Sequence, residues 1–522
     1  MPRYTAITIG PIVDTLSLTD SPAGTWGASY LFSWLARELI AGLLREGIPA
    51  EQFAAPYFEW TDGGQVAISG CEDVMGMGVG MFHDHIIFQN RINKESEFSS
   101  VHHAIQDVTQ SLAKKLKRGL AQGLVCSQLE EAELAEWLGR YLRIYAVERE
   151  VPAEEGPITA FGPILDGLEL EPSYIWEEQE NPLVTLFESQ TTGASTFGNR
   201  LLAGSFLTQE LSAQWMLRRP DGNGIRDIVS IAGDMTPGRW KSRNYYCVLC
   251  SDGDSMGKMY RQLTKTSTVQ EASRRCIAFC AESARCIRAY DGMPIYAGGD
   301  DLLAILPVTG KDGQSVLGLV QELNDIFNKQ FETERTQFDG FPSLSVGISI
   351  QYVKSPLYEA MQQARNLLYE AKKGTSKKNG LRIQLIKHSG QKVVLSVDRV
   401  SGDPFLGQLE KMIQTVRLDQ VEEFLASAGY QLELYHGLFL RVLKRYQNWL
   451  EAPGAKADPI TVFFKNLFDD EGQKQFQPYL TKLSGLCQNI VKGRPDLQPE
   501  DLAERQAGTI RFLHFMAEEG TV

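Results

Sequence analysis

The chain has 522 residues, a length typical of about three domains. Apolar residues make up 43% of it and charged residues 22%, close to the average for globular proteins, which excludes a disordered or collagen-like chain. The net charge of −13 argues against binding nucleic acid over the whole surface, because phosphate contacts need Lys and Arg, although it leaves room for one basic groove.

The sequence predicts a cytoplasmic protein without a membrane partner. The N-terminus reaches Asp14 before any apolar stretch of signal-peptide length. The apolar run 28–36 ends at Arg37, well short of the ~20 residues that span a membrane. Eight cysteines are too few for a disulfide scaffold. Cys247 and Cys250 are spaced CxxC within a predicted strand, where residues three apart point to opposite faces and would not share a zinc ion.

The first 240 residues mix helices and short strands. The apolar pattern predicts these elements: strand Ala6–Val13, helix Tyr30–Leu44, strand Met81–Gln89, helix Ile105–Leu120 and helix Leu129–Tyr145. We place one domain at residues 1–125 and a mixed, mainly helical connecting domain at 126–240.

A regular block follows at residues 241–392. Its predicted elements are strand Tyr245–Ser251, helix Val269–Ala289, strands Pro294–Ala297 and Leu302–Leu306, helix Val316–Phe331, strand Ser343–Tyr352, and a helix that begins at Ser355-Pro356. The order β-α-β-β-α-β-α is that of a split βαβ, or ferredoxin-like, domain with an extra helix. Long amphipathic stretches, Leu409–Leu425 and Leu432–Leu450, then predict a helical domain at 393–522.

Four carboxylates stand at strand ends in this block. Asp252 and Asp254 end the first strand, and Asp300 and Asp301 follow two glycines that permit a tight hairpin turn, Gly298 and Gly299. The first and third strands of a split βαβ sheet are neighbours, so we expect the carboxylates to gather. Like charges this close repel unless a cation lies between them, and Mg²⁺ takes carboxylate and phosphate oxygens. Two metal ions would stabilise an attacking hydroxyl and a leaving pyrophosphate.

Two further features each have two interpretations. Lys372, Lys373, Lys377 and Lys378 cluster at the end of the last helix of the block, which is typical of a solvated helix C-terminus. The functional interpretation is that Lys372 reaches a triphosphate as a point charge. Gly253 either forms a plain turn or lets a triphosphate approach the backbone closely.

Four segments of the block resemble the palm domain of the large polymerase/cyclase subunit of type III CRISPR effector complexes, with the Cmr-type branch nearest. They are CVLCSDGDSMGKM, PIYAGGDDLLAILP, PSLSVGISIQYVKSPLYEAMQQARNLLYEAKK and KKNGLRIQLIKHSG. Near the N-terminus, IGPI and GTWGASYLFSWLARELI resemble the family's degenerate first palm. The resemblance implies an α+β fold with two ferredoxin-like, palm-type domains, the second of them catalytic, plus helical connecting and C-terminal domains.

The resemblance also implies a function. Such proteins are RNA-activated nucleotidyltransferases that use Mg²⁺ or Mn²⁺ to join ATP through 3′–5′ linkages into cyclic oligoadenylates. They work beside other subunits of the ribonucleoprotein complex, which hold most of the guide and target RNA. The metal-binding, catalytic carboxylates match Asp252, Asp300 and Asp301. The expected nucleotide-binding residues are Gly253, Asp254, Ser273 (adenine), Gly298, Gly299 and Lys372 (phosphate).

The chain departs from the family in two respects. It starts at the first palm-like strand, so we expect no HD nuclease domain. FHDHIIF alternates like a strand, and we expect the metal-binding residues of the first palm to be lost there. The zinc site that the family carries between its palms is not visible, which makes DNA cleavage doubtful.

Three competing functions stay open at this point. Some relatives join AMP to S-adenosylmethionine as co-substrate, and the motifs do not separate that product from a cyclic oligoadenylate. A catalytically silent scaffold subunit is the second competing function, and a stand-alone diguanylate cyclase is the third.

Overall fold

The computed structural model describes most of the chain. The described residues are 1–19, 21–76, 78–120, 130–170, 181–183, 227–233, 244–338, 340–373, 378–399, 405–419, 422–451, 458–468 and 476–518. Much of the predicted connecting domain at 126–240, and Lys377, lie outside them. None of the helices within these ranges is long and apolar enough to cross a membrane.

The N-terminal part is built on a four-stranded sheet. Its elements are β1 (Arg3–Gly10), α1 (Ile12–Leu16), α2 (Pro22–Arg45), η1 (Ala50–Gln52), β2 (Phe53–Ala55), β3 (Glu59–Trp60), β4 (Val66–Ala67), α3 (Glu72–Gly76), β5 (Ile86–Gln89), α4 (Phe98–Leu120), α5 (Glu131–Tyr141), β6 (Arg143–Glu150) and α6 (Pro157–Glu169). The strand order is β2-β5-β1-β6. Because β6 pairs with β1 along its whole length, this sheet takes a strand from beyond residue 125, where we had placed the domain boundary.

A six-stranded sheet forms the middle of the molecule. Its elements are α10 (Ile228–Ala232), β7 (Tyr245–Asp254), α11 (Met256–Tyr260), α12 (Thr266–Ala289), β8 (Met293–Gly298), β9 (Asp301–Pro307), α13 (Val316–Gln330), α14 (Glu332–Gln337), β10 (Ser343–Tyr352), α15 (Leu357–Lys373), β11 (Gly380–Ile386) and β12 (Lys392–Asp398). The order β12-β11-β10-β7-β9-β8 contains the ferredoxin-like order β10-β7-β9-β8, so the predicted fold class is confirmed.

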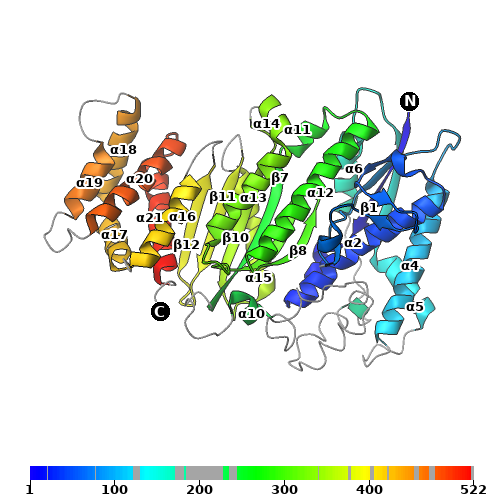
Figure 1. Cartoon of the computed structure of the whole chain (residues 1–522), viewed down its shortest axis with the longest axis horizontal. Helices are drawn as coiled ribbons and strands as arrows, with labels where there is room; N and C mark the ends of the chain where they lie inside the picture. The colour runs from blue at the N-terminus through cyan, green and yellow to red at the C-terminus, as the bar shows by residue number, and fades with distance from the viewer. Residues whose placement is uncertain are drawn as a thin grey trace.

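Both faces of the middle sheet are covered by helices (Figure 1). The strictly alternating strand β10 shows why. Its large apolar residues occupy one face and its small residues the other, and a Cβ atom at Gly347 would overlap the backbone of Ala364 and Leu368 in α15. The face with the small residues therefore lets α15 pack closely against the strand, while α12 and α13 cover the opposite face.

The two sheets share one topology. When the order β2-β5-β1-β6 is aligned with β8-β9-β7-β10, β1 corresponds to β7, β5 to β9 and β6 to β10. All neighbouring strands in both sets are antiparallel. A helix that follows the last strand of each set, α6 or α15, packs against the first strand of that set. The chain thus contains two palm-like halves of the same architecture.

The two halves are in direct contact. The backbone N–H of Ala297 in β8 donates to the carbonyl of Gly80 at 2.9 Å, and the Tyr4 and Thr266 hydroxyls lie 2.9 Å apart. One hydrophobic cluster runs through residues of both halves, including Trp34 and Phe279. The halves therefore pack against each other through a common core.

The C-terminal part is helical, as predicted, and adjoins the β12 edge of the sheet (Figure 1). Its helices are α16 (Phe405–Asp419), α17 (Glu422–Leu434), α18 (His436–Glu451), α19 (Pro459–Leu467), α20 (Gln477–Gly493) and α21 (Pro499–Glu518). The boundaries differ from our prediction: α17 ends within the predicted helix Leu432–Leu450, because apolar spacing alone does not reveal a break between two amphipathic helices.

Asp398, the last residue of β12, joins this helical part to the sheet. Its buried carboxylate accepts hydrogen bonds from Arg382 of β11 at 2.7 Å, from Arg494 after α20 at 2.6 Å, and from Arg505 of α21 at 2.8 Å. Burial raises the pKa of Asp398, but the arginines outweigh it and hold that pKa at about 2. One carboxylate thus links three guanidinium groups at the interface.

Candidate active site

The hairpin that carries the predicted catalytic pair lies beside the end of β7. Strands β7 and β9 pair antiparallel, with Ser251 opposite Leu302, so Asp252 and Asp301 occupy adjoining positions at the same sheet end. Gly298 pairs with Asp301, and Gly299 has φ +67°, the left-handed conformation that favours glycine. The structure therefore brings the hairpin and the first strand together as expected.

Lys372 forms an ion pair with Asp252. The lysine is on α15. Asp252 is paired with Ser345 on the neighbouring strand, so the side chain of Asp252 lies on the small-residue face of the sheet, which α15 covers. Burial lowers the pKa of Lys372, but the charge and hydrogen bond of Asp252 outweigh it, so that pKa is raised overall. Lys372 is thus a cation held among the carboxylates.

The hairpin carboxylates carry more negative charge than their surroundings offset. Burial and the nearby charge of Asp252 raise the pKa of Asp300 to about 7. Asp301 is reached by solvent through a cavity, yet surrounding protein atoms limit its hydration. This desolvation, with the charges of Asp252 and Asp300, raises its pKa well above the usual range. One lysine does not neutralise three carboxylates.

Asp254 is fully buried beyond the cluster. Its Oδ2 atom accepts hydrogen bonds from the Ser343 hydroxyl at 2.9 Å, the Ser345 hydroxyl at 2.7 Å and the Asn379 backbone N–H at 2.8 Å. Burial raises the pKa of Asp254, and these bonds offset that rise only in part. We propose that Asp254 ties β7 to β10 and to the start of β11, rather than contacting a nucleotide.

Ser273 is also engaged within the protein. Its buried hydroxyl accepts a hydrogen bond from the backbone N–H of Tyr57 at 2.9 Å, which joins α12 to the N-terminal half. This position favours an interface role over the adenine contact that the resemblance implied.

A cavity of about 860 Å³ lies between the two halves. Asp252 and Asp301 contribute to one wall, and Asp84 and Glu169 of the N-terminal half to another. Arg365 of α15 also lines the cavity, and sequence reasoning missed it. A signal existed, because Arg365 precedes Lys372 by two helical turns and so lies on the same helix face.

The donor set suits a divalent metal ion. Asp252, Asp300 and Asp301 offer the carboxylate oxygens that Mg²⁺ prefers, and a dication would supply the positive charge that this cluster lacks. The carboxylate oxygens of these three aspartates do not all lie within 4.8 Å of one another. Among the described residues, the group of three whose ligand atoms all lie within 4.8 Å of one another is Asp84, His85 and Glu169.

Comparison with known proteins assigns this region to a family. Residues 245–382 match the model described as Cas10/Cmr2, second palm domain. The chain is also 34% identical over 195 residues to the CRISPR system Cmr subunit Cmr2 of Pyrococcus furiosus, a match over 33% of this chain and 22% of that protein. Residues 245–382 are therefore similar to the second palm domain of Cas10/Cmr2 proteins. The chain spans about a fifth of the length of the curated Cmr2 protein that it matches.

Solved structures support the fold of this chain. A Csm1–Csm4 cassette in complex with cA4 superposes with a TM-score of 0.51 at 13% identity, over 99% of this chain and 70% of that chain. The same cassette in complex with AMPPNP gives a TM-score of 0.50 at 14% identity, with the same coverage. At these identities the likeness concerns the fold.

Gly253 gives a test of the geometry of the second palm-like half. A Cβ atom at position 253 would lie 2.5 Å from Oδ2 and 3.0 Å from Cβ of Asp300, so Gly253→Ala must displace that side chain. We expect nucleotide product formation to fall by about 10- to 100-fold, as for a misplaced catalytic group, with the fold retained.

Gly257→Ala is the matched control, because a Cβ atom at position 257 meets no atom within 4 Å. Steady-state rates of both variants, with circular dichroism spectra to check folding, measure the difference. Equal rates for Gly253→Ala and Gly257→Ala would contradict the placement of Asp300.

Proposed function

We propose that this chain is the nucleotidyltransferase subunit of a type III CRISPR antiviral complex and makes cyclic oligoadenylate from ATP when target RNA is bound. The observation that carries the proposal is the cluster of Asp252, Asp300, Asp301 and Lys372 beside an inter-half cavity, within a match to a second palm domain. Crowded carboxylates that repel one another destabilise a fold, so their presence favours a catalytic role over a silent scaffold.

The three aspartates would hold the metal ions. When bound, Mg²⁺ or Mn²⁺ supplies charge that activates a ribose 3′-hydroxyl and stabilises the leaving pyrophosphate. Lys372 contributes a positive charge for the triphosphate, since it is held beside Asp252 at the sheet end. Arg365, on the same helix and in the cavity wall, adds a planar donor suited to phosphate oxygens.

Substrate and partners are inferred from the relatives. The solved Csm1 structures hold AMPPNP in one case and cA4 in another, which favours ATP as substrate and a cyclic oligoadenylate as product here. Cmr2 is a subunit of a CRISPR Cmr system, and Csm1 is solved together with Csm4. We extend this to a ribonucleoprotein complex in which other subunits hold most of the guide and target RNA, in keeping with the net negative charge of this chain.

The test uses the assembled complex. It is incubated with Mg²⁺ and ATP, with and without target RNA and with and without S-adenosylmethionine, and the products are identified by mass spectrometry. We expect RNA-dependent pyrophosphate release and cyclic oligoadenylates in both conditions. An adduct of AMP that forms with S-adenosylmethionine would replace the proposed product by that of the S-adenosylmethionine-using relatives. A parallel incubation replaces ATP by GTP, and pyrophosphate released from GTP instead of ATP would favour a diguanylate cyclase. If no pyrophosphate were released in any condition, the chain would be a catalytically silent scaffold subunit.

A further inference from the structure

The shared register of the two halves identifies counterparts of the catalytic residues. In the catalytic half Ser251 of β7 pairs with Leu302 of β9, and in the N-terminal half Ile7 of β1 pairs with Ile86 of β5. Counting one residue outward from each pair matches Thr8 with Asp252 and His85 with Asp301. A second step along the hairpin matches Asp84 with Asp300. The N-terminal half therefore carries Asp84 and His85 where the catalytic half carries its aspartate pair.

The helical residue has a counterpart as well. Lys372 stands at the end of α15 and pairs with Asp252 of β7; Glu169 ends α6 and accepts a hydrogen bond from the Thr8 hydroxyl of β1 at 2.9 Å. The helix cation of the catalytic half is thus replaced by an anion. The N-terminal half therefore has a carboxylate, which can bind a metal ion, at the position where the catalytic half has a lysine.

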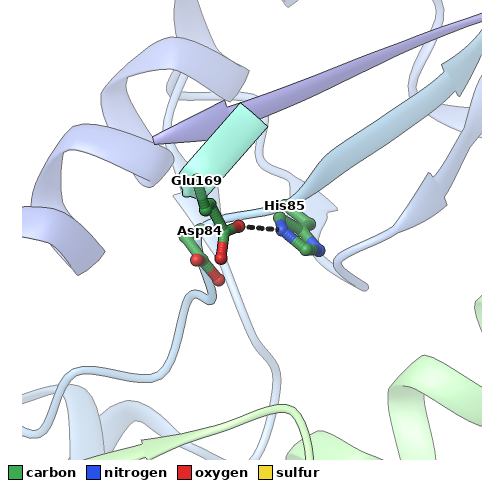
Figure 2. A group of neighbouring side chains, drawn as sticks. All are labelled: Asp84, His85 and Glu169. Atoms are coloured by element: carbon green, nitrogen blue, oxygen red, sulfur yellow. Dashed lines mark hydrogen bonds and ion pairs between the residues drawn. The ribbon is translucent and has the colours of Figure 1, made fainter. Parts of the chain in front are cut away.

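Three side chains from these positions converge (Figure 2). His85 Nε2 lies 2.6 Å from Glu169 Oε1, and ligand atoms of Asp84, His85 and Glu169 all lie within 4.8 Å of one another. Asp84 and His85 precede β5 directly, while Glu169 comes from α6, so two elements of the N-terminal half position the set. Asp84 and Glu169 also line the inter-half cavity, which gives an ion a path from solvent.

We propose that Asp84, His85 and Glu169 form a second metal site, in the N-terminal half, for a divalent transition-metal ion such as Mn²⁺. One imidazole and two carboxylates suit Mn²⁺ better than Mg²⁺, which prefers oxygen ligands alone. The Thr8 hydroxyl orients Glu169 as an outer ligand partner would. From the sequence we expected the metal-binding residues to be lost at FHDHIIF. No motif in the sequence shows that Glu169 lies beside this segment.

His83 is not part of the set. The backbone N–H of His85 donates to His83 Nδ1 at 3.2 Å, so the His83 ring is engaged locally. The simpler interpretation of the remaining three residues is a plain His85–Glu169 ion pair with Asp84 beside it. The two interpretations differ in whether a metal ion binds an imidazole of this chain.

The experiment is electron paramagnetic resonance of the full chain with added Mn²⁺. A Mn²⁺ ion bound to imidazole shows a ¹⁴N coupling in electron spin-echo spectra, whereas an ion on the three palm aspartates does not. We expect the coupling in the wild type and its loss in His85→Gln. Glu169→Gln should weaken the Mn²⁺ population that shows the coupling by at least about tenfold.

His103→Gln is the matched control, because His103 forms an exposed pair with Glu46 at 3.6 Å. It should keep the ¹⁴N coupling. The proposal is overturned if wild-type protein shows no ¹⁴N coupling at saturating Mn²⁺, or if the coupling survives in His85→Gln.

The metal measurement is separate from the proposed activity, since it needs neither ATP nor RNA nor a partner subunit. The palm variant Asp300→Ala with Asp301→Ala should lose product formation and keep the ¹⁴N coupling. A ¹⁴N coupling without nucleotide product would support the N-terminal metal site and refute the proposed function. Nucleotide product without a ¹⁴N coupling would support the proposed function and refute the N-terminal metal site.

Discussion

Replacing Asp300 and Asp301 together by alanine is expected to abolish nucleotide product while leaving the chain folded and able to join its complex. The pair supplies two of the three carboxylates that would hold the metal ions, so we expect pyrophosphate release to fall by about 1,000-fold or more. The fold should not suffer, because the substitution removes two crowded carboxylates whose pKa values are raised by desolvation and by the neighbouring charge of Asp252. A melting temperature equal to or above that of the wild type is expected.

Asp312→Ala is the control, since Asp312 is exposed in the turn after β9. Pyrophosphate release, thermal melting and size-exclusion chromatography of the assembled complex measure the three properties. Added Mg²⁺ should raise the melting temperature of the wild type and of Asp312→Ala but not that of the double variant. Wild-type rates in the double variant would show that the active site lies elsewhere.

Asp398→Asn is expected to produce the largest loss of stability. The side chain is 3% exposed, and it forms ion pairs with Arg382, Arg494 and Arg505. Removing one member of a buried charge network leaves its partners uncompensated, which costs about 3–5 kcal/mol. We expect hydrogen exchange to increase in β12 and α21, since Arg505 of that helix loses its acceptor.

The same carboxylate predicts the response to acid. The pKa of Asp398 is about 2 in the folded chain and ordinarily 3.8, so its stabilising contribution is complete above about pH 4. It is lost as the pH falls from about 4 to about 2, because the unfolded chain takes up the proton in this range while the folded chain still resists it. Thermal melting of wild type and variant from pH 7 down to pH 2 should therefore converge.

Asp496→Asn is the control for this site. Asp496 pairs with the same Arg494, but its side chain is 64% exposed, so its loss should cost less than about 1 kcal/mol. If Asp398→Asn melted like Asp496→Asn, the network would not hold the helical part to the sheet.

The sequence predicted the parts of the fold that depend on local periodicity. The alternation of Ser343–Tyr352 and the apolar spacing of Val269–Ala289 both correspond to observed elements, and the split βαβ order correctly placed the GGDD hairpin beside the first strand. The aspartate cluster followed from that order. The phosphate-binding role of Lys372 stays a prediction. Its ion pair with Asp252 was not predicted, because that pair depends on α15 covering the small-residue face.

Relations between distant segments were not predictable in this way. The burial of Asp254 depends on hydroxyls of β10 and on the backbone of Asn379. The pairing of β6 with β1, and the meeting of His85 with Glu169, join segments far apart in the chain with no motif to connect them. The same holds for Asp398, whose three partners come from different elements.

The common strand order of the two halves has a consequence for how the cavity is assembled. If each wall belonged to a separate polypeptide, the fraction of complete cavities would follow protein concentration. Here a single covalent chain supplies both walls, so their encounter is intramolecular and is set by an effective local concentration. Dilution cannot dismantle the cavity, which leaves its opening and closing to rearrangements within the chain or to the molecules that bind it. Because the two halves are encoded separately within one chain, each wall can also acquire its own substitutions. In a dimer of identical subunits every substitution would appear in both walls.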